Sequence, residues 1–405
     1  MSHVSLLKEP KYRKLLVSAG FSWMFDAMDV GLISFIVAAL RVEWHLTNGQ
    51  VGWLASSGSL GMVFGAAAAG YFADRYGRKQ ILLWTILIFS AASGLSALAG
   101  SVAVLCILRF VAGIGLGGEL PVASTLVSES VPVAARGRAV VLLESFWAVG
   151  WIVAAIISYF VVPKYGWQSA FIIGALPALY AIYLRRSIED SPKYIEQREI
   201  TKISLAQKLR LVWSREHRRS TIMLWLLWFC VVFSYYGMFL WLPTIMTDKG
   251  FTLVKSFEYV LIMTLAQLPG YFTAAYFIEK FGRKFVLVVY LILTALSALW
   301  FGYASTVSML LAAGICLSFF NLGAWGAMYA YSPELYPTRV RTTGVGLATS
   351  IGRVGGVIGP LLVAQWKTAH VEMFTIFLVF FITIIVGAVA VLILGKETKG
   401  VELTD

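Results

Sequence analysis

The amino-acid sequence predicts an all-α membrane protein in which twelve transmembrane helices form two pseudo-symmetric six-helix halves. Of the 405 residues, 59% are hydrophobic and 13% are charged, and the mean hydropathy is +0.79. These values lie far outside the usual range of soluble domains. A helix needs about 20 mostly apolar residues to cross the bilayer core, and twelve segments near that length follow one another along the chain. An internal repeat divides them into two halves.

Each predicted helix is an apolar segment, and short loops separate the segments. The first six segments span residues 15–40, 50–73, 81–99, 101–126, 140–162 and 167–184, and the second six span residues 220–247, 256–278, 285–303, 306–330, 343–366 and 371–395. The first segment is too long, and too rich in aromatic and acidic residues, for a cleaved signal peptide. We therefore expect it to remain as the first helix.

Lysine and arginine residues collect on one side of the predicted membrane. If the N-terminus is cytoplasmic, 26 of the 33 fall on the cytoplasmic side and five on the outer side, with Arg109 and Arg353 inside helices. Basic residues in short loops favour the cytoplasm, so we expect a multi-pass protein of the plasma membrane with both termini inside. The net charge of +12 follows from this asymmetry and does not indicate nucleic-acid binding.

A repeat with an offset of 205 residues relates the two halves. The stretch GYFADRYGRK at 70–79 recurs as AYFIEKFGRK at 275–284. The same offset relates Glu129 to Glu334, Pro132 to Pro337, Arg136 to Arg341 and Gly150 to Gly355. We expect an N-terminal half at 1–184, a basic cytoplasmic linker at 185–219, and a C-terminal half with a short tail at 220–405. Parallel halves are typical of transporters that bind substrate between them near the bilayer midplane.

The residue patterns do not favour an enzyme. Cys106, Cys230 and Cys316 fall within predicted helices without paired spacing, which indicates neither a disulfide framework nor a metal site. The sequence has no nucleophile–base constellation, glycine-rich phosphate loop or metal-ligand spacing that an enzyme or an ATP-driven pump would need. We expect no enzymatic activity, no metal and no cofactor.

Several motifs resemble those of the major facilitator superfamily. They are GYFADRYGRK after the second predicted helix, RFVAGIGLGGE in the fourth, EDSPKYI after the sixth, SPELYPTRVRTTG after the tenth and KETKG near the C-terminus. The stretches SWMFDAMDVGLISF, GIGLGGELPVAS and ELYPTRVRTTG are most similar to bacterial niacin permeases, within the sugar-porter and organic-ion branch. The resemblance implies the major facilitator fold and secondary active transport by alternating access.

Charged residues cluster at the cytoplasmic ends of predicted helices in both halves. They are Asp74, Arg75, Arg78, Glu129 and Arg136 in the first half, and Glu279, Arg283, Glu334 and Arg341 in the second. Such clusters can lock helix ends together while the cytoplasmic side is closed. Solvated loop charges are the alternative. We favour a cytoplasmic gate, because the acids recur in both halves and an isolated surface ion pair contributes only about 0–1 kcal/mol.

Acids outnumber arginines inside the predicted helices, where each charge costs about 2.5–3.5 kcal/mol. Arginine keeps its proton, so at least one acid is a candidate proton carrier. By resemblance to proton symporters of sugars and aromatic acids, Asp29 pairs with Arg109 and couples protonation to the transport cycle. Asp26 lies three residues earlier on the same face, so the two acids are candidates to share one proton. A structural clamp between the first and fourth helices is the alternative.

Glu119 and Glu144 are two further candidates for proton coupling. They lie in the fourth and fifth predicted helices. Glu144 is followed at i+3 and i+7 by Trp147 and Trp151, a stripe that also fits a packed tryptophan seam.

Arg353 predicts a substrate with negative charge. It lies about ten residues into the eleventh predicted helix, and no acid is expected nearby in the C-terminal half. A guanidinium without a fixed partner fits a carboxylate that arrives and leaves. The position also resembles the one in the eleventh helix of organic-ion transporters that recognises the charge of the substrate. A structural or lipid-facing arginine is the alternative.

Aromatic and amide side chains complete the predicted substrate site. The candidates are Trp23, Tyr235, Tyr236, Gln267, Asn321, Trp325 and Tyr329. They offer stacking surfaces and a few oriented hydrogen bonds, although most aromatic residues in membrane proteins serve packing or interface belts. With Arg353 they suit a small, flat aromatic carboxylate.

We expect import of a small aromatic carboxylate by proton symport, and the resemblance makes nicotinate (niacin) the specific prediction. The seventh segment, FCVVFSYYGMFLWLPT, lacks the glutamine-rich run of sugar porters, and Lys396 stands where they carry proline. A sugar–proton symporter is thus a weaker alternative, as is an organic-ion or drug transporter. A facilitative uniporter would show no proton dependence, and a membrane sensor would bind ligand without flux. The expected partners are the organic anion, protons and the lipid bilayer, and we expect a monomer.

Overall fold

The computed structural model describes residues 9–76, 78–132, 136–187, 204–337 and 340–400. The helices of the first half are α1 Pro10–Glu43, α2 Asn48–Tyr76, α3 Arg78–Ser96, α4 Val102–Ser130, α5 Arg136–Phe160, α6 Val162–Tyr165, α7 Trp167–Gly174 and α8 Pro177–Ser187. After α10 Leu205–Val212, the second half contains α11 Arg218–Phe239, α12 Leu242–Asp248, α13 Leu253–Leu265, α14 Gln267–Phe281, α15 Arg283–Tyr303, α16 Val307–Glu334, α17 Arg341–Thr368 and α18 Met373–Leu394.

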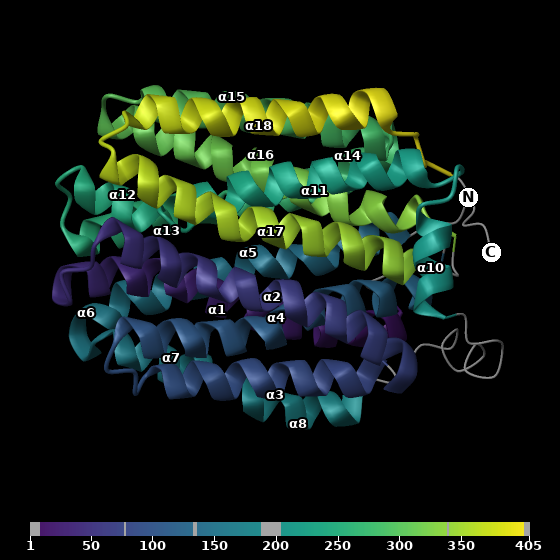
Figure 1. Ribbon diagram of the computed structural model, residues 1–405, viewed down its shortest axis with the longest axis horizontal. Helices are drawn as coiled ribbons and strands as arrows, with labels where there is room; N and C mark the ends of the chain where they lie inside the picture. The colour runs from purple at the N-terminus through teal and green to yellow at the C-terminus, as the bar shows by residue number, and fades with distance from the viewer. Residues whose placement is uncertain (1–8, 77, 133–135, 188–203, 338–339, 401–405) are drawn as a thin grey trace.

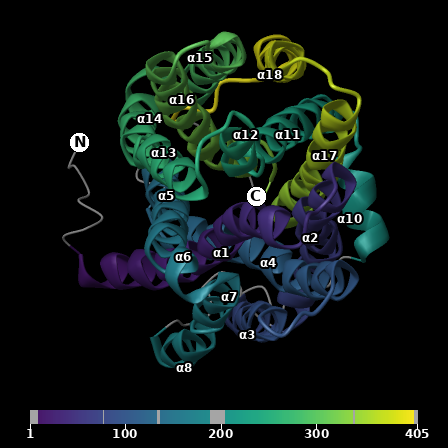
Figure 2. The same ribbon diagram turned by 90° about the vertical axis from the view of Figure 1, so that its left-hand side faces the viewer.

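The long helices run side by side along the longest axis of the molecule (Figure 1). Helix α10 lies at one end, which we call the α10 end, and α6 lies at the opposite α6 end. Viewed from the α6 end, helices α1–α8 group on one side and α11–α18 on the other (Figure 2). The halves meet where α2 packs against α17 and where α5 packs against α13, α14 and α16. The predicted all-helical architecture in two halves is confirmed.

Within the described residues, 11 helical spans are long and apolar enough to cross a membrane, and the shorter apolar stretch Trp167–Tyr183 occupies the place of the predicted sixth helix. Three predicted helices are interrupted. The sixth breaks between α7 and α8, the seventh between α11 and α12, and the eighth between α13 and α14. Pro177, Pro243 and Pro269 lie at or just after these breaks, because proline has no N–H to donate to the preceding turn.

The predicted linker at 185–219 contains a helix that the sequence analysis did not anticipate. Ser204 caps α10 in a capping box with Gln207, a pairing that satisfies two backbone N–H groups at the helix start. Helix α8 also extends to Ser187, and α11 begins at Arg218. The expected boundaries of the two halves thus remain a prediction, with helical residues on both sides of the proposed limits.

Candidate binding site between the two halves

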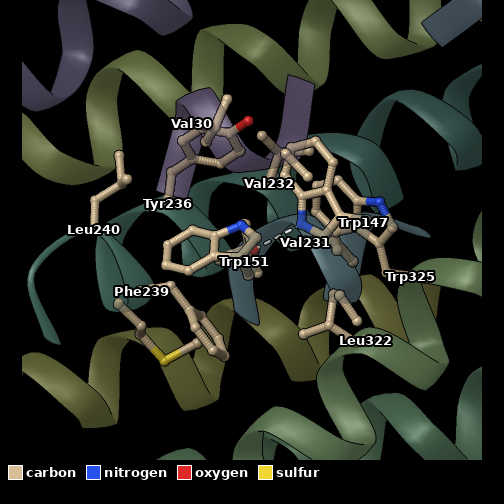
Figure 3. Close-up of a cluster of buried hydrophobic side chains, with 14 of the residues drawn as sticks. Val30, Trp147, Trp151, Val231, Val232, Tyr236, Phe239, Leu240, Leu322 and Trp325 are labelled. Atoms are coloured by element: carbon tan, nitrogen blue, oxygen red, sulfur yellow. Dashed lines mark hydrogen bonds between the residues drawn. The ribbon is translucent and has the colours of Figure 1, made fainter. Parts of the chain in front are cut away.

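A cluster of large aromatic side chains fills the centre of the interface. We define the central aromatic cluster as Trp23, Trp147 and Trp151 from the first half with Trp228, Tyr235, Trp325 and Tyr329 from the second; every member is at most 2% exposed. Figure 3 shows Trp147 facing Trp325 across the interface, with ring centroids 6.2 Å apart and an interplanar angle of 20°. The Trp147 indole donates a 2.9 Å hydrogen bond to the Tyr235 hydroxyl. Planar surfaces from both halves therefore meet at one place.

Arg353 lies beside this cluster on α17 and is 2% exposed. Its Nη1 donates a 2.5 Å hydrogen bond to the Tyr236 hydroxyl, and its guanidinium lies 5.6 Å from the centroid of that ring. Its Nε has no hydrogen-bond partner among the described residues. In that part of the chain, then, the buried cation is held by a neutral phenol, which leaves donor capacity for an anion.

Several other buried polar groups near the interface also lack hydrogen-bond partners within the described ranges. They include Trp23 Nε1, Trp325 Nε1, Tyr329 Oη, Asn321 Oδ1 and both polar side-chain atoms of Gln267. An unsatisfied buried polar group costs about 1–3 kcal/mol, so native proteins seldom retain many of them. Their concentration here indicates a site that receives polar ligands or water.

Asp29 and Arg109 form a fully buried ion pair within the first half. Arg109 Nη1 lies 2.8 Å from Asp29 Oδ2, and the two side chains are 3% and 2% exposed. Ser93 donates a 2.5 Å hydrogen bond to Asp29 Oδ1, Arg109 Nη2 donates a 3.1 Å bond to Ser96, and the guanidinium lies 4.8 Å from the Phe171 ring centroid. The pair therefore ties α1 to α3, α4 and α7.

Asp26 has a different neighbour from Asp29. Its carboxyl adjoins that of Glu119 on α4, and Ser22, one turn earlier on α1, donates a hydrogen bond to Glu119 Oε1. Neither oxygen of Asp26 accepts a hydrogen bond from any described residue. Two adjacent buried carboxyls cannot both ionise without strong repulsion, so they favour a shared proton. Spacing along the helix suggested that Asp26 shares a proton with Asp29. In the structure, the carboxyl next to Asp26 is that of Glu119.

Glu144 is 0% exposed and lies on α5, one turn before Trp147. The indole of Trp23 lies near its carboxyl, but outside hydrogen-bond geometry, so both Glu144 oxygens stay without a partner in the described part of the chain. Arg353 interacts with it electrostatically. Glu144 thus belongs to the central cluster and is separate from the two acid sites on α1.

The two halves touch at both ends of the molecule. At the α6 end, Arg41 Nη1 lies 3.2 Å from Asp248 of the second half, and Asp248 also accepts a hydrogen bond from Lys367. At the α10 end, a Cβ added to Gly137 would lie 2.7 Å from Arg283 Nη2, so Arg283 reaches across to α5. The halves therefore contact each other at both ends of the molecule.

The expected gate residues of the second half lie at the α10 end. Arg283 Nε is 3.2 Å from Glu334 Oε2, whereas Arg341 donates hydrogen bonds to the carbonyls of Pro333 and Tyr336 and Glu279 is exposed. The side chains of the remaining expected gate residues, Asp74, Arg75, Arg78, Glu129 and Arg136, lie outside the described part of the structure.

Several residues that contribute to the site or to its ends were not predicted from the sequence. Trp228, whose ring centroid is 4.7 Å from that of Tyr329, looked like any other aromatic residue in an apolar helix. Ser22 and Ser93 lack a signal of their own, although Ser22 lies one turn before Asp26 on the same helix face. In the tail, Glu397 accepts hydrogen bonds from the backbone of Arg283 and Lys284 at the start of α15, which the KETKG motif did not reveal by itself.

Comparisons with known proteins agree with the motifs. The family model of the Major Facilitator Superfamily matches residues 19–270 and 259–404. The chain is 58% identical over 391 residues to the putative niacin/nicotinamide transporter NiaP of Bacillus subtilis, covering 96% of this chain and 98% of that protein. It is 44% identical over 416 residues to the niacin transporter NiaP of Acinetobacter baylyi, covering 96% and 95%. The expected resemblance to bacterial niacin permeases is confirmed.

Solved structures share the fold. The proton:xylose symporter XylE bound to 6-bromo-6-deoxy-D-glucose superposes with a TM-score of 0.79 at 19% identity over 96% of each chain. The inward open conformation of the xylose transporter XylE from E. coli gives 0.73 at 18% identity, over 95% of this chain and 97% of that one. The chain therefore belongs to the major facilitator superfamily and is a multi-pass membrane transporter rather than an enzyme.

Proposed function

We propose that this protein imports nicotinate into the cell by proton symport. The observation that carries the proposal is the pairing of a buried arginine, Arg353, with a cluster of aromatic rings drawn from both halves. A small aromatic carboxylate matches both parts, because a guanidinium binds a carboxylate with two parallel hydrogen bonds and flat rings stack on flat rings. Two relatives named for niacin transport support the same substrate.

The substrate site in this proposal contains Arg353 for the carboxylate and Trp23, Tyr235, Trp325 and Tyr329 for the ring. Tyr236 holds Arg353 until the anion arrives. The unpartnered Gln267 and Asn321 supply further hydrogen bonds. Nicotinamide has no carboxylate, so Arg353 favours the acid over the amide.

The proton in this proposal is shared by Asp26 and Glu119. The two carboxyls adjoin each other and form no direct ion pair with a cation among the described residues, whereas Asp29 already has Arg109 and Ser93. Loss of the shared proton would leave two buried negative charges side by side, which opposes closure of the halves. Asp29 and Arg109 then hold α1 against α3 and α4 while the proton comes and goes.

Transport proceeds by alternating opening of the two ends, with the α10 end and both termini in the cytoplasm, as the distribution of Lys and Arg favours. The Arg41–Asp248 contact releases when the outer end opens, and the Arg283–Glu334 pair moves away from α5 when the inner end opens. The matching charges of the first half, from Asp74 to Arg136, complete the inner gate.

The test is uptake of labelled nicotinate into proteoliposomes of the purified protein, with and without an inward proton gradient. We expect accumulation above equilibrium only with the gradient, strong competition by unlabelled nicotinate, weaker competition by nicotinamide, and none by glucose. Uptake that equilibrates regardless of the gradient would indicate a uniporter. Competition by glucose but not by aromatic acids would indicate a sugar symporter, and full activity in Arg353→Ala would remove the proposed anion site.

A further inference from the structure

Glu144 is a buried acid to which neither the proton site nor the anion site assigns a task. It is 0% exposed, and neither of its oxygens accepts a hydrogen bond from a described residue. It shares one face of α5 with Trp147 and Trp151, at positions i, i+3 and i+7, and Figure 3 shows both of these indoles at the interface between the halves. Its carboxyl is therefore presented to the central aromatic cluster.

The surroundings of Glu144 come from both halves. Besides the nearby Trp23 indole, Arg353, Tyr271 and Tyr329 interact with it electrostatically. Glu144 and Arg353 form no direct ion pair in the part of the chain that the structure describes, and each keeps an unpartnered atom there. A ligand between them would thus have one polar contact on the second half and another on the first.

A neutral carboxyl is the form that such a site favours. Burying an isolated carboxylate costs far more than burying the neutral acid. Among the described residues, no second carboxyl acts on Glu144 as Glu119 does on Asp26. A neutral carboxyl carries one O–H donor. Glu144 therefore offers a hydrogen-bond donor beside aromatic rings, on the first half, whereas the cation Arg353 lies on the second.

We propose that Glu144 selects for a heteroaromatic ring by donating its carboxyl hydrogen to the ring nitrogen of a substrate whose carboxylate is bound by Arg353. This inference rests on the proposed function and deepens it, because it identifies the group that distinguishes a pyridine carboxylate from benzoate. Benzoate presents only C–H at the corresponding place, which leaves the Glu144 donor unpartnered. The substrate also bridges the two halves, so the ring nitrogen contributes to closure as well as to binding.

The experiment measures inhibition constants for nicotinate and benzoate against labelled nicotinate uptake in the wild type, Glu144→Gln and Glu144→Leu. We expect the wild type to prefer nicotinate by about tenfold or more, since a hydrogen bond to a buried partner contributes about 1.5 kcal/mol. Glu144→Gln keeps an N–H donor and should keep the preference. Glu144→Leu should weaken nicotinate by about tenfold and leave benzoate unchanged or tighter.

Two results would overturn the proposal. One is a wild type that does not distinguish the two acids, and the other is a Glu144→Leu variant that keeps the wild-type ratio of the two inhibition constants, whether both are unchanged or both are weakened equally. Tyr329→Phe tests the alternative donor. If only this variant loses the preference for nicotinate over benzoate, the ring nitrogen binds the Tyr329 hydroxyl and not Glu144. If Glu144→Leu does not yield folded protein, the proposal is tested by titrating the wild type with the three pyridine carboxylates and following tryptophan fluorescence. We expect nicotinate to bind more tightly than picolinate and isonicotinate, whose nitrogen lies elsewhere on the ring, and equal binding refutes the assignment. Absence of nicotinate uptake in the wild type would instead refute the proposed function.

Discussion

Replacing Asp29 with asparagine should destabilise the protein far more than the same change at Asp26. Both residues lie on α1 and are 1% exposed, so burial does not distinguish them. Their partners do. Asp29 neutralises Arg109 at 2.8 Å, whereas Asp26 lies against a second acid, Glu119.

The size of the effect follows from what each change leaves behind. Asp29→Asn leaves the Arg109 guanidinium, 3% exposed, with neutral Ser96 and the new side-chain amide as its polar contacts and the Phe171 ring at 4.8 Å. Removing one partner of a buried ion pair costs about 3–5 kcal/mol. Asparagine can still accept one hydrogen bond, so we expect about 3 kcal/mol, or roughly a hundredfold in the folding equilibrium. Asp26→Asn instead supplies an N–H donor to Glu119 and should leave stability within about 1 kcal/mol of wild type, or raise it.

The assay is SDS titration of each purified variant in mixed micelles, followed by tryptophan fluorescence, with proton-driven uptake measured in parallel. Asp29→Asn should lower the free energy of unfolding, and Arg109→Gln combined with it should recover part of the loss, because no buried charge is then left alone. Asp26→Asn should keep its stability and lose proton-driven accumulation. Equal destabilisation by the two asparagine variants, or accumulation that survives Asp26→Asn, would refute this division of roles.

Three further outcomes follow from other parts of the structure. Gly113→Ala should destabilise the protein by several kcal/mol, because its Cβ would lie 2.0 Å from the Gly58 carbonyl oxygen. The matched control is Gly346→Ala, whose Cβ would have nothing within 4 Å, and it should gain up to about 1 kcal/mol of stability. The same SDS titration measures both variants. Gly137→Leu should displace Arg283 and increase the access of a thiol reagent to cysteines placed at the α10 end. Asp248→Asn removes the negative charge that pairs with Arg41 and Lys367, on a side chain that is 31% exposed. We expect a free energy of unfolding within about 1 kcal/mol of wild type but greater thiol access at the α6 end. Unchanged access would show that these ion pairs do not hold the α6 end closed.

The fold could be predicted from the sequence because its determinants are periodic and local. Apolar runs near the length of a membrane span and a repeat at a constant offset identify helices and halves without any knowledge of contacts. The helix breaks before Pro177 and Pro243 carry a local signal too, but hydropathy averages over it. The capping box at Ser204 and Gln207 is equally local, and it was obscured because the surrounding segment is rich in charge and outside any apolar run.

The candidate site could be predicted only in its components. Residue types marked Arg353 and the acids as buried charges, since each is costly in an apolar helix. The partner of each acid depends on how α1 is rotated against α3 and α4, which spacing along one helix does not encode. Asp26 and Asp29 are three residues apart and still face different neighbours, Glu119 and Ser93. Pairing is a property of the packed bundle, so resemblance identified the Asp29–Arg109 pair and missed the acid beside Asp26.

The unpartnered groups at the centre explain how binding and closure can be coupled. The halves touch at both ends, and this arrangement buries polar atoms of Arg353, Glu144 and Asp26 without partners in the described chain. Each such group costs about 1–3 kcal/mol, so closing an empty and deprotonated protein is unfavourable. In the proposed mechanism, a carboxylate on Arg353, a ring nitrogen on Glu144 and a proton on Asp26 would each remove one of these costs. Closure would then be most favourable when substrate and proton are both bound, which is the condition that couples the two in symport.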